Sequence, residues 1–236
     1  MGTERDKEEK INRETRKVEI NTPDTGYQPF PVSIMNKSTH EGLTFDPSLG
    51  KPATISYSLN KSGCIRIRIV RRDQQDLMLR TLQDWTDQEF GKYEVKWDGR
   101  DASGNIIDNK KVLIIFEARD QGKGRLHHNH NKELCHDPKL IFETNPESVQ
   151  KLKGVFEIWT AFSGETPSDW DNQGYEVRYF IDYKPVKTER FEKGAKRFGF
   201  KIDTAGLCNG EHLITVNIDD LQDHIGSAGL MIRVEN

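Results

Sequence analysis

Apolar residues recur at every second position along much of this chain, and this period constrains its fold more than any other feature. In residues 64–71 three isoleucines alternate with Arg66, Arg68 and a valine, and residues 53–59 alternate in the same way. Because successive side chains of a β-strand point to opposite faces, the pattern predicts strands with isoleucines inward and arginines outward. Asn60, Lys61, Ser62 and Gly63 form a turn between the two runs, which predicts a hairpin.

Further β-like runs follow, and turn-forming clusters separate them. No helical period persists over more than two turns in the first half of the chain. Strands at this spacing predict an all-β chain that folds as β-sandwiches. The remaining predicted strands are residues 77–82, 92–97, 112–118, 139–143, 155–161, 175–182, 196–202, 213–218 and 229–234.

The length of 236 residues accommodates two domains. We expect a charged N-terminal arm and loop (1–38), a first sandwich (39–120), a His-rich linker (121–137) and a second sandwich (138–236). Residues 1–20 carry six basic and six acidic side chains, so they form a disordered leader, a charged helix or an arm that docks on a partner.

Charge and hydropathy argue against two classes of partner. Lys and Arg number 35 against 38 Asp and Glu, and this near balance makes neither nucleic acid nor an acidic membrane an obvious partner. No apolar run approaches the roughly 20 residues of a membrane span. We expect an extracytoplasmic or organelle-lumen location if a leader has been removed, and a cytoplasmic location otherwise.

The string Trp97-Asp-Gly-Arg-Asp-Ala-Ser-Gly-Asn105 ends one predicted strand. It resembles the loop of the FlgD-like immunoglobulin-like domain, and the resemblance covers about residues 50–119. That family continues with Gly-Val-Tyr, where this chain has Asp108-Asn-Lys-Lys-Val-Leu-Ile114. The resemblance implies an immunoglobulin-like sandwich with Trp97 in its core, and it says little about function. Asp98 and Asp101 are expected to cap this turn through side-chain hydrogen bonds.

The second half resembles the immunoglobulin-like domains of bacterial secreted and surface proteins. This resemblance implies a spacer, an adhesion module or a carbohydrate-associated module, and it makes His212 structural. Tyr183 stands where the family has glycine, so we expect a different type of turn there. The matching residues are Val177, Tyr179, Ile181, Asp182, Pro185, Val186, Asp203, Thr204, Gly206, Leu207, Asn209, Gly210, His212, Thr215, Val216, Gly226, Ala228 and Val234.

The linker gathers His127, His130, Cys135 and His136, whose imidazole and thiolate groups suit zinc or another transition metal. The spacing matches no standard zinc finger, and the alternative is a polar linker that packs on a sandwich or a partner. Only half of a Cys-x-x-Cys-His haem attachment motif is present. The cysteines are odd in number, and Cys64 and Cys208 are expected to be buried thiols.

Aromatic residues of the second half are candidate interface anchors. Trp170 lies in a polar loop, and Tyr179 and Phe180 are adjacent on one strand, so one of them should face outward.

The sequence therefore predicts two immunoglobulin-like β-sandwiches in tandem with a charged N-terminal arm, and a non-catalytic function. We expect a structural or assembly protein that binds protein partners in a larger bacterial complex, or a homo-oligomer. A more specific hypothesis is an accessory subunit of a multi-subunit oxidoreductase of the nitrite oxidoreductase type. The alternatives are a carbohydrate-binding or adhesion module, and a metal- or haem-handling protein that uses the His-rich linker.

Overall fold

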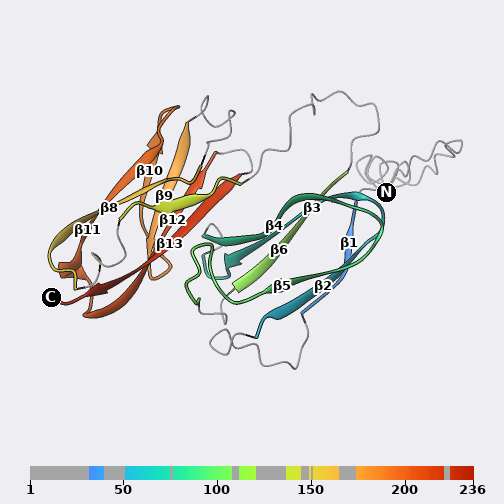
Figure 1. Ribbon diagram of the computed structural model, residues 1–236, viewed down its shortest axis with the longest axis horizontal. Helices are drawn as coiled ribbons and strands as arrows, with labels where there is room; N and C mark the ends of the chain where they lie inside the picture. The colour runs from blue at the N-terminus through green and yellow to red at the C-terminus, as the bar shows by residue number, and fades with distance from the viewer. Residues whose placement is uncertain are drawn as a thin grey trace, which may run out of the picture.

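A computed structural model shows two β-sandwiches joined in tandem (Figure 1). It describes residues 32–39, 51–74, 77–107, 112–120, 137–144, 149, 151–164, 174–220 and 224–236. In this part of the chain, no helix is long and apolar enough to cross a membrane. The N-terminal arm and the linker up to residue 136 lie outside the described residues.

The first sandwich consists of two three-stranded antiparallel sheets. One sheet has the order β1-β2-β5, and its strands are β1 (Ile34–Thr39), β2 (Ala53–Leu59) and β5 (Gly91–Trp97). The other has the order β4-β3-β6, and its strands are β3 (Gly63–Arg71), β4 (Met78–Gln88) and β6 (Val112–Asp120). Since β1 belongs to this sandwich, the domain begins before the predicted boundary at residue 39.

The second sandwich pairs a three-stranded sheet with a four-stranded one. The sheet β11-β8-β7 contains β7 (Leu140–Phe142), β8 (Val155–Phe162) and β11 (Arg197–Asp203). The sheet β10-β9-β12-β13 contains β9 (Tyr175–Ile181), β10 (Lys184–Phe191), β12 (Gly210–Asp219) and β13 (Ile225–Val234). A short 3₁₀ helix, η6 (Thr204–Gly206), connects β11 to β12.

The two sandwiches share one strand order, typical of immunoglobulin-like domains: β1-β2-β5 and β4-β3-β6 in the first correspond to β7-β8-β11 and β10-β9-β12 in the second. The predicted hairpin between residues 53–59 and 64–71 is wrong, because β2 pairs with β1 and β5 while β3 pairs with β4 and β6. The turn at Asn60–Gly63 instead carries the chain from one sheet to the other. The alternation is correct because Ile55, Leu59 and the isoleucines of β3 all face the same core from opposite sheets.

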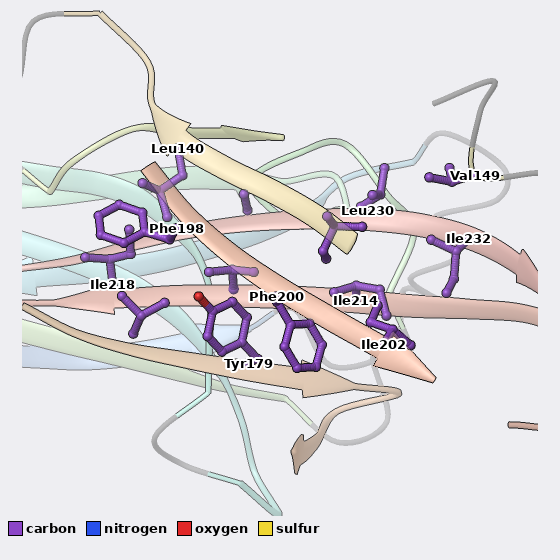
Figure 2. Close-up of a cluster of buried hydrophobic side chains, with 14 of the residues drawn as sticks. Leu140, Val149, Tyr179, Phe198, Phe200, Ile202, Ile214, Ile218, Leu230 and Ile232 are labelled. Atoms are coloured by element: carbon purple, nitrogen blue, oxygen red, sulfur yellow. The ribbon is translucent and has the colours of Figure 1, made fainter. Parts of the chain in front are cut away.

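Each sandwich has its own core of inward side chains. In the second one, the ring of Tyr179 stacks on that of Phe200 with centroids 4.6 Å apart, and side chains from both sheets meet between the layers (Figure 2). Trp97 is buried in the first sandwich, as predicted, and its indole N–H donates to the carbonyl oxygen of Arg100 (3.1 Å).

Most of β1 lies outside the predicted strands, and β10 was not predicted at all. It is exposed over most of its length, so its residues show no two-residue alternation, and it carries Pro185 at a register shift. It lies at the edge of its sheet, the position where proline is tolerated.

Candidate functional site: the joint between the two sandwiches

The outer face of the four-stranded sheet packs against one end of the first sandwich. Phe180 of β9 and Leu213 of β12 are buried in one apolar cluster with residues of the first sandwich. Because residues of β12 alternate between the core of their own sandwich and this cluster, the strand is buried on both faces. The first sandwich contributes Ile55, Ile69, Leu77, Leu79, Trp97 and Ile107 to the cluster.

Asn217 joins the two sandwiches through the backbone of Met78. Its side-chain oxygen accepts from the Met78 N–H (2.8 Å), and its amide group donates to the Met78 carbonyl oxygen (2.8 Å). The hydroxyl of Ser227 donates to the same carbonyl (2.9 Å). Since Asn217 is fully buried, the bonds form away from water and fix the register of the two domains.

The loop after β5 forms the opposite wall of the joint. Asp98 and Asp101 cap it as predicted: each accepts from a backbone N–H two residues on, those of Arg100 (3.1 Å) and Ser103 (2.9 Å). Burial raises the pKa of the Asp101 carboxyl, and hydrogen bonds from the loop only partly offset this. The Ser103 hydroxyl accepts from the N–H of Gly229 on β13 (2.8 Å).

Gly229 leaves no room for a larger residue at this contact. A Cβ atom at this position would meet the carboxylate of Asp101 and lie 2.8 Å from the side-chain nitrogen of Asn105. The loop of the first sandwich therefore approaches the backbone of β13 directly. The loop at residues 98–105 therefore has a docking role that its sequence motif did not specify.

A buried ionic network flanks the joint around Asp137. The carboxylate accepts from Arg68 (2.5 Å) and from the hydroxyl of Thr81 (2.6 Å) on the first sandwich. It also accepts from the N–H of Ile225 (3.0 Å) on the second. Asp137 therefore binds both domains, although the sequence assigned it to a linker.

Arg66 and Arg68 face away from the core of the first sandwich, as predicted, yet they are buried. Their exposed fractions are 0% and 7%, because a polar layer covers this face of β3. Arg66 forms a bidentate pair with Glu117 (2.7 Å for both bonds), and its guanidinium lies 4.4 Å from the ring centroid of Trp85. An outward direction on β3 therefore does not make these arginines exposed.

The β9–β10 turn contacts the joint through Tyr183. Asp182 and Tyr183 both have positive φ angles (48° and 67°), as a two-residue type I′ turn requires. This is the turn type that an Asp-Gly pair favours, so the expected change of turn type was wrong. The guanidinium of Arg71 lies 4.0 Å from the centroid of the Tyr183 ring, which holds this side chain against the first sandwich.

His212 is structural, as predicted. Its Nδ1 lies 2.6 Å from the Asp182 carboxylate, and its Nε2 lies 2.8 Å from the Cys208 carbonyl oxygen. Burial alone would lower the pKa of His212, but hydrogen bonds to Cys208 and Asp182 outweigh it and the pKa is raised. Because both partners are acceptors, this arrangement favours the doubly protonated ring.

A cleft of about 370 Å³ lies beside the joint and includes Arg80, Asp84, Asp137 and Lys139 in its wall. The carboxylate of Asp84 accepts from the Asp137 N–H (2.8 Å), and Arg80 pairs with Asp98 (2.9 Å). Arg80, Asp84 and Asp137 are thus engaged in contacts within the protein.

The predicted interface residues are placed differently from expectation. Tyr179 and Phe180 are both fully buried, so neither faces solvent. Tyr179 points into its own core, while Phe180 points outward from the sandwich and is covered by the other domain. Burial raises the pKa of the Tyr179 hydroxyl. Trp170 lies outside the described residues.

The predicted metal ligands His127, His130, Cys135 and His136 also lie outside the described residues. Within the described ranges, no three His, Cys, Asp or Glu side chains gather as a metal site would need. Cys64 is buried as predicted, and burial raises its pKa to about 11. Cys208 is exposed, contrary to prediction, because it lies in the turn before β12.

Asn217, Met78 and Asp137 are the joint residues that sequence reasoning missed. Asn217 falls at an outward position of a predicted strand, and a buried polar residue there has no distinctive spacing. The one sequence feature that hints at the joint is a glycine within a strand, Gly229, which allows another backbone to approach closely. A single glycine does not identify which segment approaches it.

No protein-family model matches the chain, and no curated protein matches it either. Among solved structures it is similar to an endo-beta-1,4-mannanase from Thermotoga petrophila, with 15% identity, a TM-score of 0.30 and coverage of 46% of this chain. The chain spans 22% of that enzyme's length.

Two other solved structures cover more of the chain. The FN1-FN3 domains of chicken CNTN1 match with 13% identity and a TM-score of 0.26, over 76% of this chain and 62% of that one. A 1.5-MDa bacterial ice-binding adhesin matches with 12% identity and a TM-score of 0.29, over 89% and 67%. Likenesses this low carry no information on function.

Proposed function

We propose that this protein is a non-catalytic structural protein that holds protein partners at a fixed spacing and orientation. The observation that carries this proposal is the joint, where Phe180 and Leu213 bury apolar surface and Asn217 bonds both backbone groups of Met78. A flexible tether between two independent modules needs no such contact. A buried, specific joint is useful where the distance between two binding surfaces matters.

The described surface offers features that suit the binding of protein partners. Each of the four sheets ends in two terminal strands among the described ones, β10 of the second sandwich being one that is largely exposed, and exposed sheet edges are sites of strand pairing with partners. Phe90, 72% exposed, lies in the turn between β4 and β5, at the end of the first sandwich opposite the joint. An exposed phenylalanine at a distal turn is a suitable anchor for a protein partner.

The more specific role, an accessory subunit of a nitrite oxidoreductase-type assembly, stays a prediction. The carbohydrate alternative needs an exposed pair of coplanar rings, and the described residues give it little support. Tyr179 is buried, and the ring of Trp159 lies over Gly199 with the guanidinium of Arg197 4.6 Å from its centroid.

The test is to purify the endogenous protein under native conditions and identify bound proteins by mass spectrometry. We expect a stoichiometric complex that reforms in vitro with the wild-type chain. Recovery of the protein alone, as monomer or dimer, would overturn the proposal.

A joint variant tests whether orientation matters in that complex. Gly229→Arg forces a long side chain into Asp101 and Asn105, whereas Gly206→Arg enters open space. We expect Gly206→Arg to assemble normally and Gly229→Arg to fail, with circular dichroism confirming that its strands persist. Equal assembly of both variants would show that the joint is irrelevant to partner binding.

A further inference from the structure

The outer face of the sheet β11-β8-β7 lies on the side of the second sandwich opposite the joint, because the joint uses the four-stranded sheet. Leu140, Ile158 and Phe200 point into the core, so the odd-numbered residues of these three strands form the outer face. The cross-strand register arranges them in rows along β8: Val155 with Asp203, Glu157 with Lys201, Trp159 with Gly199, and Ala161 with Arg197 and Ile141.

This outer face is exposed at both of its ends. Val155, in the first row, is 70% exposed, and Ile141, in the last row, is 46% exposed. The side chain of Arg197, beside Ile141, is 57% exposed, and Lys201 and Asp203 are exposed as well. Apolar side chains at both ends, with a tryptophan between them, make this face a candidate contact surface.

The middle of the face is held in place before any partner binds. The ring of Trp159 lies over Gly199, where an added Cβ would be 2.9 Å from two of the ring carbons. The guanidinium of Arg197 lies 4.6 Å from the ring centroid and pairs with Glu143 (2.6 Å). A ring that is already fixed loses little freedom on binding, which favours a contact here.

Strand β11 carries opposite charges at its two ends on this face. Arg197 begins the strand and Asp203 ends it. A two-fold axis perpendicular to the strand therefore places Arg197 of each copy opposite Asp203 of the other. The same axis places Lys201 of each copy opposite Gly199 of the other, so the ammonium group reaches the tryptophan ring that covers this glycine.

Strand β8 is complementary to itself under the same rotation. The axis passes over the paired residues Ile158 and Phe200, which lie at the middle of the rows. Val155 of one copy then lies opposite Ala161 of the other, beside Ile141. Apolar ends therefore meet each other where the charged ends of β11 also meet. An unrelated partner would match this arrangement only by coincidence, whereas a second copy matches it by symmetry.

We propose that two copies of this chain pack face to face through the outer face of the sheet β11-β8-β7, in the aligned manner of stacked sheets. Three short strands present less than the roughly 800 Å² per partner of a standard interface, so the dimer dissociates on dilution. This inference does not depend on the proposed function, because the face lies away from the joint.

Sedimentation equilibrium of the full chain over a concentration series tests the proposal. Arg197→Glu and Asp203→Arg each place like charges opposite one another twice in the dimer. We expect each variant alone to associate at least about tenfold more weakly than the wild type. In an equimolar mixture the introduced glutamate faces the introduced arginine, and the unchanged Asp203 and Arg197 still face each other. We therefore expect the mixture to associate as strongly as the wild type.

Mixing cannot repair a folding defect within one chain, so recovery in the mixture identifies a contact between copies. The matched control Arg190→Glu reverses a charge on β10, where the side chain is 76% exposed, and should associate like the wild type. A wild type that stays monomeric up to about 1 mM would overturn the proposal, and the face would then be open to a different partner. Dimers that all variants form equally, or variants that mixing does not restore, would overturn it as well.

Discussion

The outer faces of β3 and β12 show two ways in which a sandwich covers the side that points away from its core. On β3, arginines 66 and 68 are buried beneath Glu117, Asp137 and the ring of Trp85. On β12, Leu213 and Asn217 are buried beneath the other domain. Both faces alternate with a core-facing row, so the alternation alone does not reveal what covers them.

The ionic layer over β3 and the apolar contact over β12 should contribute differently to the stability of the protein. Apolar contacts at β12 gain stability from surface removed from water. Charged groups at β3 lose hydration when buried, and the attraction between partners roughly offsets this loss. The joint should therefore contribute to the free energy of unfolding. The ionic layer should contribute little as a whole, but removing one of its charged side chains should destabilise the protein, because the partner charge is then buried without a counter-charge.

Phe180→Ala should have the largest effect, because it removes a fully buried ring between the two sandwiches. We expect a loss of about 4 kcal/mol in the free energy of unfolding, typical of a buried phenylalanine. Urea denaturation measures this change. Phe90→Ala, at an exposed turn, is the matched control and should stay within about 0.5 kcal/mol of the wild type. A loss below about 1 kcal/mol for Phe180→Ala would mean that the joint does not persist in solution.

Asp137→Ala should have the next largest effect, since it leaves Arg68 without its closest carboxylate. We expect a loss of about 3 kcal/mol, as for other broken buried ion pairs. Glu143→Ala breaks a more exposed pair with Arg197 and should cost less than about 1 kcal/mol. Similar losses in the two variants would show that the Asp137 network is effectively solvated.

The outer faces of β3 and β12 also show which parts of the fold the sequence predicts and which it does not. The two-residue period identifies the core-facing strands from β2 onward, and it fails at β10, whose side chains are mostly exposed on both faces. It could not distinguish a hairpin from a crossover between sheets, since Ile55 and Ile65 face a common core in either case. The partners of Asn217 and Asp137 are 139 and 69 residues distant, and no local pattern encodes such pairs.

Gly229→Ala tests the close approach of the loop to β13, and its expected loss of stability is smaller than that of the two variants above. The added methyl group meets the carboxylate of Asp101, so the loop must shift, and we expect a loss of about 2 kcal/mol. Gly206→Ala is the control, because nothing lies within 4 Å of its added Cβ. Thermal unfolding of both variants measures the difference. Equal midpoints would place the loop farther from β13 than the contact with Ser103 implies.

The smallest expected effect is a pH dependence that arises from His212. Its pKa is raised in the folded protein, so its stabilising contribution is complete below the unfolded pKa of about 6.5 and is lost as pH rises through the folded pKa. The contribution should be less than about 1 kcal/mol, because the partner carboxylate of Asp182 is 46% exposed and solvent screens the pair. We expect stability to fall between about pH 6 and pH 8 in the wild type, and to fall less in His212→Gln.

Urea denaturation midpoints measured across this pH range give the slope of stability against pH for both proteins. Parallel slopes would assign the titration to another group. Because Asp182 precedes Tyr183 in the turn that contacts Arg71, the same titration should loosen the joint slightly as pH rises.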